Sequence, residues 1–289
     1  MTSPDASTAT APDSGYSPAR TLPLRVEAIR QLRRRRTMLA FGVMLGLPWI
    51  IAAAFELGGG TSGGNTTGLA SLATAGGLNF AAFSLYASTG FLLVVAVALF
   101  CGDTIASEAS WSSLRYLLAA PVPRARLLRQ KLAVALGYSV PAVVLFPAMS
   151  LAAGTALYGW HPLRLPGSLI DLPSGTALAR LGIALAYILI TLLFVAGLAF
   201  LLSVSTDSPL GAVGGTVGLA IVSSILDSVT ALGSWREILP THWQYSWLTA
   251  LQPQVSWDPM IEGAVVSVSY AVVLLALAFR RFRHKDIVS

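Results

Sequence analysis

Six long apolar stretches, each almost free of charge, decide what this chain can fold into. A helix needs about 20 apolar residues to cross a bilayer, and the stretches approach or exceed that length. Only 11% of the 289 residues are charged, whereas soluble domains carry about 25%. The sequence therefore predicts an all-α membrane protein with six transmembrane helices. The expected spans are about residues 37–57, 80–101, 132–158, 178–203, 210–230 and 263–279.

The segment before the first span has two parts. Residues 1–20 are rich in Ser, Thr, Pro and Ala, so we expect a disordered tail ahead of a six-span domain over 21–289. In residues 22–36, apolar side chains recur at near-helical spacing and arginines fill most of the remaining positions. This pattern predicts an N-terminal interfacial helix on the membrane surface, with its arginines among lipid phosphates. A basic flank that only sets topology is the alternative.

The basic residues gather on one side of the predicted membrane. Six spans place both termini on the same side, which holds seven basic residues between Arg20 and Arg36, five between Arg115 and Lys131 and four after the last span. The positive-inside rule then puts both termini in the cytoplasm. The net charge of +6 reports this topology and not binding to nucleic acid. Because arginine far outnumbers lysine and alanine is abundant, which is typical of GC-rich bacterial genomes, we expect the bacterial plasma membrane.

Catalytic and metal-binding patterns are missing from the sequence. It contains no P-loop of the form G-x-x-x-x-G-K-[ST], so we expect no ATP hydrolysis by this chain. The histidines at 161, 242 and 284 lack the spacing of metal ligands, and Cys101 lies in an apolar run, where it is expected to pack. We therefore expect no enzyme activity and no bound cofactor or metal. A polytopic membrane enzyme or an ion-coupled carrier stays open as the alternative.

Polar and small residues near the fifth span are possible functional positions. Asp227 is expected toward the outer face, at the interface or a helix end, with a role in a transport pathway as the alternative. The Trp-rich segment 231–260 predicts an interfacial belt, with a substrate-contacting lid as the alternative. Two small-xxx-small pairs permit close helix approach. The glycines of these pairs are Gly211, Gly214, Gly215 and Gly218, and the tryptophans of the expected belt are Trp160, Trp235, Trp243, Trp247 and Trp257.

The largest polar island lies between the second and third spans, over residues 102–131. About 30 residues are kept where a short loop would suffice, and a Pro-x-Pro sequence ends the helical pattern. Such an amphipathic helix is what a membrane subunit would use to dock a soluble partner, and a membrane-surface connector is the alternative. The residues at helical intervals are Ile105, Glu108, Ser112 and Arg115.

This polar island resembles the signature of type-2 ABC transporter permeases. That signature has a Glu, a Gly-Thr-Leu-Arg, a Leu-Leu, a Pro-Val-Ser-Arg and a Lys that opens the third span. Ser112-Ser113 stand here where Gly-Thr is usual, and Pro123 stands where Ser is usual. The matching positions are Gly102, Asp103, Ile105, Ala106, Glu108, Leu114, Arg115, Leu117, Leu118, Pro121, Val122, Arg124, Leu128 and Lys131.

The resemblance implies that the chain is the membrane-spanning subunit of a bacterial ABC exporter. Two permease chains, identical or paired with a related one, would work with separate ATPase chains that carry ATP and Mg²⁺. The helix near 104–118 would be a cytoplasmic coupling helix seated in a groove of the ATPase. Because the spans are lined by Ala, Val, Leu and Gly, we expect an amphiphilic or apolar cargo.

The resemblance also implies roles for individual residues, none of them catalytic. Glu108 and Arg115 would make the polar contacts to the ATPase and to the connector helix. Arg124 and Lys131 would anchor the segment at lipid phosphates. The glycines of the fifth span would pack near the seam between two permease chains or near the pathway. Asp103 and Ser112 complete the expected coupling set.

Overall fold

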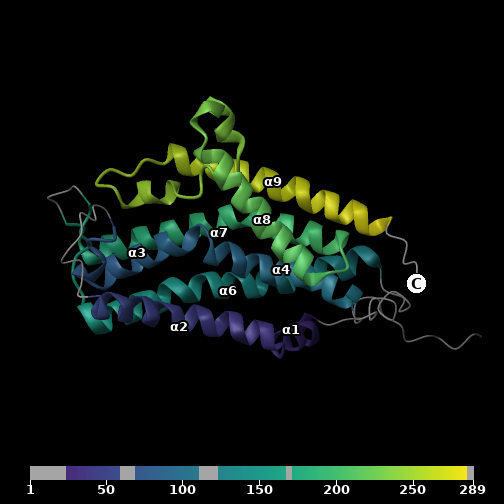
Figure 1. Cartoon of the computed structure of the whole chain (residues 1–289), viewed down its shortest axis with the longest axis horizontal. Coiled ribbons are helices and arrows are strands. Elements are labelled where there is room, and N and C mark those ends of the chain that lie inside the picture. The colour runs from purple at the N-terminus through teal and green to yellow at the C-terminus, as the bar shows by residue number, and fades with distance from the viewer. Residues whose placement is uncertain (1–23, 59–68, 111–122, 167–170, 285–289) are drawn as a thin grey trace, which may run out of the picture.

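The computed structural model describes residues 24–58, 69–110, 123–166 and 171–284. Within these ranges the chain is all-helical, and six helices are long and apolar enough to cross a membrane, which confirms the predicted class (Figure 1). These six are α2 (Arg35–Leu57), α4 (Leu92–Ser110), α6 (Arg124–Tyr158), α7 (Ser174–Ser205), α8 (Pro209–Ser228) and α9 (Asp258–Arg283). The shorter elements are α1 (Leu24–Leu32), η2 (Ala73–Ala75), α3 (Gly77–Thr89), η3 (Thr230–Ile238) and η4 (Ser246–Leu251).

The second span differs from the prediction. The expected single helix over 80–101 is two helices, α3 and α4, which are separated at Gly90. A Cβ on Gly90 would lie 2.6 Å from the hydroxyl of Tyr245, so glycine allows the close approach at this break. The polar residues that were expected to follow the span instead continue α4 as far as Ser110. A charged residue need not end a buried helix when partners from elsewhere neutralise it.

α4 lies in the middle of the bundle and the outer helices surround it. In the most apolar part of α4, 78% of the residues are buried, whereas the figure is 17% for both α2 and α8. The buried core includes Phe100 of α4, Phe146 of α6 and Ile188 of α7. Exposed leucine, isoleucine and valine side chains cover the outer faces of α2, α8 and α9. Such apolar outer faces suit a lipid environment.

Glycines let α3 and α6 approach each other closely. A Cβ on Gly77 would lie 2.4 Å from Cγ2 of Thr155, and one on Gly154 would lie 2.8 Å from Cβ of Phe80. A side chain at either Gly77 or Gly154 would therefore hold the two helices apart. The fifth-span glycines behave differently: Gly214 and Gly218 have no atom within 4 Å of an added Cβ. Of the remaining two, Gly211 faces Ser208 of its own turn and Gly215 faces Leu202 of α7.

The tryptophans of the outer segment have unequal environments. Trp160, Trp235 and Trp257 are half or more exposed. Trp247 is fully buried in the core, so its expected place in an exposed belt is wrong. It lies in η4, which packs against α7, and its indole therefore fills space inside the bundle.

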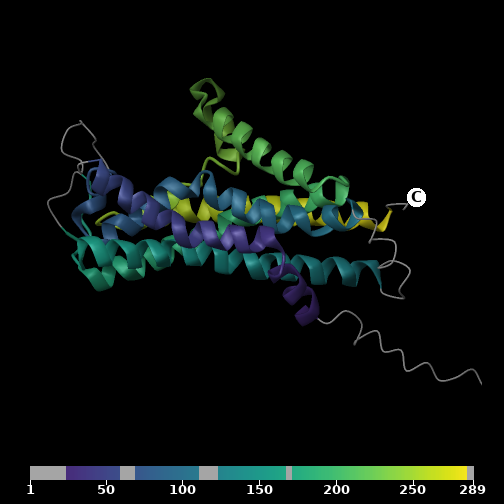
Figure 2. The ribbon, with the colours of Figure 1, turned by 60° about the horizontal axis from the view of Figure 1, so that its bottom comes forward.

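The two ends of the bundle differ in construction. We call the end formed by α1, the first turn of α2, the end of α4 and the start of α6 the charged end. We call the end formed by η2, η3, η4 and the connection from α6 to α7 the looped end. In Figure 1 the charged end lies to the right. Figure 2 shows that α8 leans away from the other helices as it runs toward η3.

Candidate functional site

Two carboxylates of α4 are buried at the charged end. Asp103 is 7% exposed and Glu108 is 2% exposed. Burying a carboxylate costs several kcal/mol unless cations and hydrogen bonds compensate it. The partners come from α1, from the junction between α1 and α2, and from α6. Four elements therefore meet around two acidic side chains.

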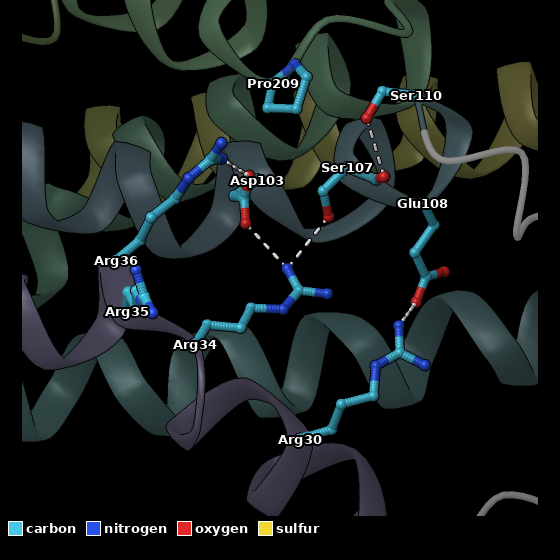
Figure 3. A pocket seen from close by; sticks show the side chains of 9 residues that line it. All are labelled: Arg30, Arg34, Arg35, Arg36, Asp103, Ser107, Glu108, Ser110 and Pro209. Carbon is cyan, nitrogen blue, oxygen red and sulfur yellow. Dashed lines mark hydrogen bonds and ion pairs between the residues drawn. The ribbon is translucent and has the colours of Figure 1, made fainter.

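Asp103 binds the beginning of α2. Nη1 of Arg34 lies 2.8 Å from Oδ2 of Asp103, and Nη1 of Arg36 lies 2.5 Å from Oδ1 (Figure 3). Arg34 also donates to the hydroxyl of Ser107, one helical turn further along α4, at 3.0 Å. Each oxygen of the carboxylate thus has its own guanidinium group. These bonds fix the start of α2 against the end of α4.

Glu108 joins α4 to both α6 and α1. Nζ of Lys131 lies 2.6 Å from Oε1 of Glu108, and Arg30 binds the same oxygen. Lys131 is itself buried, and it reaches a second carboxylate, Oε1 of Glu27 in α1, at 3.0 Å. Lys131 is therefore held between two acids from two helices. Such pairs bind helices together only as long as both charges are present.

The pKa of Glu27 reflects this environment. Burial by itself would raise the pKa of the carboxyl group. The positive charges of Lys131, Arg30 and Arg34, together with the hydrogen bond from Lys131, outweigh burial and hold the pKa below its ordinary value. Glu27 is consequently ionised at neutral pH, and its charge attaches α1 to the bundle.

These side chains form one unit, which we call the ion-pair cluster. It consists of Glu27, Arg30, Arg34, Arg36, Asp103, Glu108 and Lys131. A cavity of about 630 Å³ lies beside it. The cavity is lined by Arg30, Arg34, Arg35, Arg36, Asp103, Ser107, Glu108, Ser110 and Pro209. Guanidinium groups in such a number favour binding of anions.

The structure brings together three residues of the expected coupling set, Asp103, Glu108 and Lys131. Glu108 binds Arg30 of α1 as well as Lys131, and two of the other expected contacts do not occur in the described part of the chain. Lys131 is buried among carboxylates and does not reach out to lipid phosphates. Glu108 is almost inaccessible, so its side chain is not presented to a partner protein. Arg124 is the first residue of α6, and Ser112 and Arg115 lie outside the described residues.

The three arginines of the cluster were predicted to lie among lipid phosphates, and they instead bind carboxylates. Arg30, Arg34 and Arg36 belong to the basic run before the first span, which by itself gives no sign of its partners. The sequence signal that could have revealed these partners is the pair of acids, Asp103 and Glu108, just beyond the second apolar run. If α4 is allowed to continue, those acids are buried and require cations.

Asp227 lies far from this cluster in the fold, in the last turn of α8 at the looped end. Its Oδ1 is 2.5 Å from Nδ1 of His242, and Arg236 donates to its backbone carbonyl at 3.1 Å. Asp227 thus joins the end of α8 to the segment that follows it. A position at a helix end was one of the expectations from the sequence. In the part of the chain that the structure describes, no group of three or more His, Cys, Asp or Glu residues could hold a metal ion.

Comparison with known proteins gives a family without an assigned activity. Residues 59–288 match the family described as "Protein of unknown function (DUF2705)". No curated protein matches the sequence. The match includes both carboxylates of α4 and Lys131 of α6. It leaves out Glu27, Arg30, Arg34 and Arg36, which complete the cluster from α1 and α2.

Proposed function

We propose that this chain, which belongs to the DUF2705 family, is the membrane-spanning permease subunit of an ATP-driven ABC exporter. The proposal places it in the bacterial plasma membrane with both termini in the cytoplasm and an amphiphilic substrate as cargo. A separate ATPase subunit binds ATP and Mg²⁺ and hydrolyses the nucleotide. The permease chain itself performs no catalysis.

The buried contact between Glu108 and Lys131 carries the proposal. These are the first and last charged residues of the permease-like pattern after Asp103, and they meet at 2.6 Å although 23 positions separate them. Their pairing holds the end of α4 to the start of α6, so the connection between these helices begins and ends on a fixed base. A coupling segment needs such a base, because a force applied to it then moves both spans together.

The ion-pair cluster extends this base to the N-terminal helices. Lys131 binds Glu27 of α1, and Arg34 and Arg36 bind Asp103 from the start of α2. In the proposal, α1 is the interfacial connector helix, and its exposed Val26 and Ile29 enter the membrane surface. A push on the connection between α4 and α6 would therefore also reach α2.

A second permease chain, identical or related, completes the proposed transporter. The outer face of α8 supports this part of the proposal, because it is apolar and only lightly covered within the chain. Gly214 and Gly218 leave open space beside them, and a second helix could approach closely there. The exposed apolar residues on α8 are Leu210, Leu219, Ile221, Val222, Ile225 and Leu226.

Co-purification with an ABC-type ATPase tests the proposed function. The tagged full chain is expressed with a candidate ABC-type ATPase, solubilised in mild detergent and assayed for bound ATPase and for export. We expect stable retention, and a loss of about tenfold or more in Arg115→Glu, because charge reversal at a docking contact costs over about 1.4 kcal/mol. Arg164→Glu at the looped end is the matched control, and it should retain the ATPase.

The opposite results would favour the other class of function. A chain that never retains the ATPase would contradict the exporter assignment. Transport or turnover that proceeds at full rate without any ATPase would favour an ion-coupled carrier or a membrane enzyme. Equal retention in Arg115→Glu and Arg164→Glu would overturn the docking role of Arg115 alone.

A further inference from the structure

We propose that the cavity at the charged end binds the phosphate group of an anionic phospholipid. The cavity of about 630 Å³ lies between the junction of α1 and α2, the end of α4 and the first residue of α8. Four arginines from one short stretch of chain, Arg30 and Arg34 to Arg36, line it (Figure 3). This inference goes beyond the exporter function and does not depend on it.

The charge of the cavity is positive after its own ion pairs are counted. Its lining holds four guanidinium groups against the carboxylates of Asp103 and Glu108. Beyond the lining, the charges of Glu27 and Lys131 cancel each other. A net charge of about +2 in a partly buried space attracts an anion, and a phosphodiester or a phosphate supplies one or two negative charges.

The arginines keep donors that their carboxylates do not use. A guanidinium group has five N–H donors in a fixed planar fork, which fits phosphate oxygens. Arg34 directs Nη1 to both Asp103 and Ser107, and Arg36 directs Nη1 to Asp103. Among the described residues, the other nitrogens of these two groups make no hydrogen bond, so they can donate to a ligand. Pro209 also brings the N-terminus of the 20-residue helix α8 to the cavity, where the helix dipole favours negative charge.

Arg35 is the residue that most clearly indicates a ligand. It lines the cavity, and among the described residues no carboxylate pairs with it. Its neighbours Arg34 and Arg36 both bind Asp103. Arg35 is exposed, so its guanidinium group is accessible to an anion that enters the cavity from outside the chain.

The position of the cavity favours a lipid as the source of the phosphate. The span of α2 starts at Arg35, and Met38 and Leu39 follow with 57% and 69% of their surfaces exposed. One helical turn is about 5.4 Å, so the arginines lie about one turn from side chains that suit the acyl region. Basic pockets at this level of a membrane protein bind anionic headgroups. An acidic peptide from a partner protein is the rival occupant.

Lipid selection by the full chain tests the proposal without any ATPase. The chain is reconstituted in phosphatidylcholine nanodiscs containing a minor fraction of phosphatidylglycerol, and bound lipid is counted by native mass spectrometry. We expect one retained phosphatidylglycerol per chain and about fivefold weaker retention in Arg35→Gln, the effect of one basic residue near a membrane surface. Arg33→Gln is the matched control, because Arg33 is exposed in the same run but does not line the cavity.

Several results would overturn this site. Equal losses in Arg33→Gln and Arg35→Gln would mean diffuse surface charge, and no preference for phosphatidylglycerol would contradict a headgroup site. Stabilisation of the wild-type chain but not of Arg35→Gln by inorganic phosphate, without lipid selection, would assign the cavity to a soluble anion and overturn the lipid source. Displacement of the lipid by a synthetic acidic peptide that binds more tightly would favour the rival occupant. Because no ATPase is present, each of these outcomes leaves the exporter proposal untouched.

Discussion

The charged end and the looped end solve the same problem, buried polar groups, by different means. At the charged end, side chains bind side chains of opposite charge from distant helices, as Asp103 and Glu108 do. At the looped end, side chains mostly bind backbone groups. Asn79 exchanges two hydrogen bonds with the backbone of Arg164, and Tyr187 donates to the carbonyl of Trp243 at 2.7 Å.

The difference concerns what each end can do without unfolding. A side chain bound to a backbone carbonyl has one partner at one place, so it fixes the shape of a loop. Lys131 and Arg30 each contact two carboxylates, Glu27 and Glu108. Ion pairs that share partners in this way can exchange them during a small helix movement at little net cost. The charged end therefore links several helices through shared charges, whereas the looped end fixes its loops through single backbone contacts.

The largest expected effect is the loss of Glu108. In Glu108→Ala, the buried Lys131 loses one of the two carboxylates that bind it among the described residues. We expect the free energy of unfolding in detergent to fall by about 3 kcal/mol, because one partner of a buried pair is removed. Chemical or thermal unfolding measures this change. Glu262→Ala, an exposed glutamate of α9, is the control and should change stability by less than about 0.5 kcal/mol. Equal effects would show that the cluster does not hold the charged end together.

An intermediate effect is expected at the looped end from Gly77→Ala. The added Cβ would lie 2.4 Å from Cγ2 and 2.7 Å from the backbone nitrogen of Thr155. Because α3 and α6 must then separate, we expect a loss of about 2 kcal/mol in the free energy of unfolding. The same substitution at Gly214, where nothing lies within 4 Å, should stabilise α8 slightly. A Gly77→Ala chain as stable as the wild type would contradict a tightly fixed looped end.

The smallest expected effect is the pH dependence of Glu27. Its pKa is lowered in the folded chain, so the stabilisation is fully present above the ordinary value of 4.5 and is lost as the pH falls through the folded pKa. We expect wild type to exceed Glu27→Gln by on the order of 1 kcal/mol at pH 7. Unfolding measured from pH 7 to below 4.5 should show this advantage shrinking only at the acidic end. A difference that is constant over the whole range would mean that charge is not its cause.

The sequence predicts the helices better than the contacts between them. Hydropathy locates the apolar runs of α2, α7 and α8 to within a few residues, because those helices end where the apolar runs end. It fails for the second span, since it cannot detect the break at Gly90 or the continuation of α4 through two acids. That continuation depends on Arg34, which lies 69 positions away from Asp103.

The site was predictable in composition but not in pairing. The permease-like pattern includes Asp103, Glu108 and Lys131, which the structure brings together at the charged end. Their other partners come from a basic run that the positive-inside rule already explains, so nothing in the sequence assigned those arginines to carboxylates. The contact between Lys131 and Glu27 spans 104 positions, and no local spacing rule reaches that far.

The length of α6 has a mechanical consequence. This single helix has 35 residues, which is about 52 Å at 1.5 Å per residue. It carries Lys131 of the ion-pair cluster near one end and Gly154, pressed against α3, near the other. A tilt of about 5° around the α3 crossing would therefore shift Lys131 by about 3 Å, because about 35 Å of helix lies between the two positions. α6 can thus transmit movement along its length. It would pivot where Gly154 contacts α3, and the salt bridges of Lys131 would pass the movement to α4 and α1.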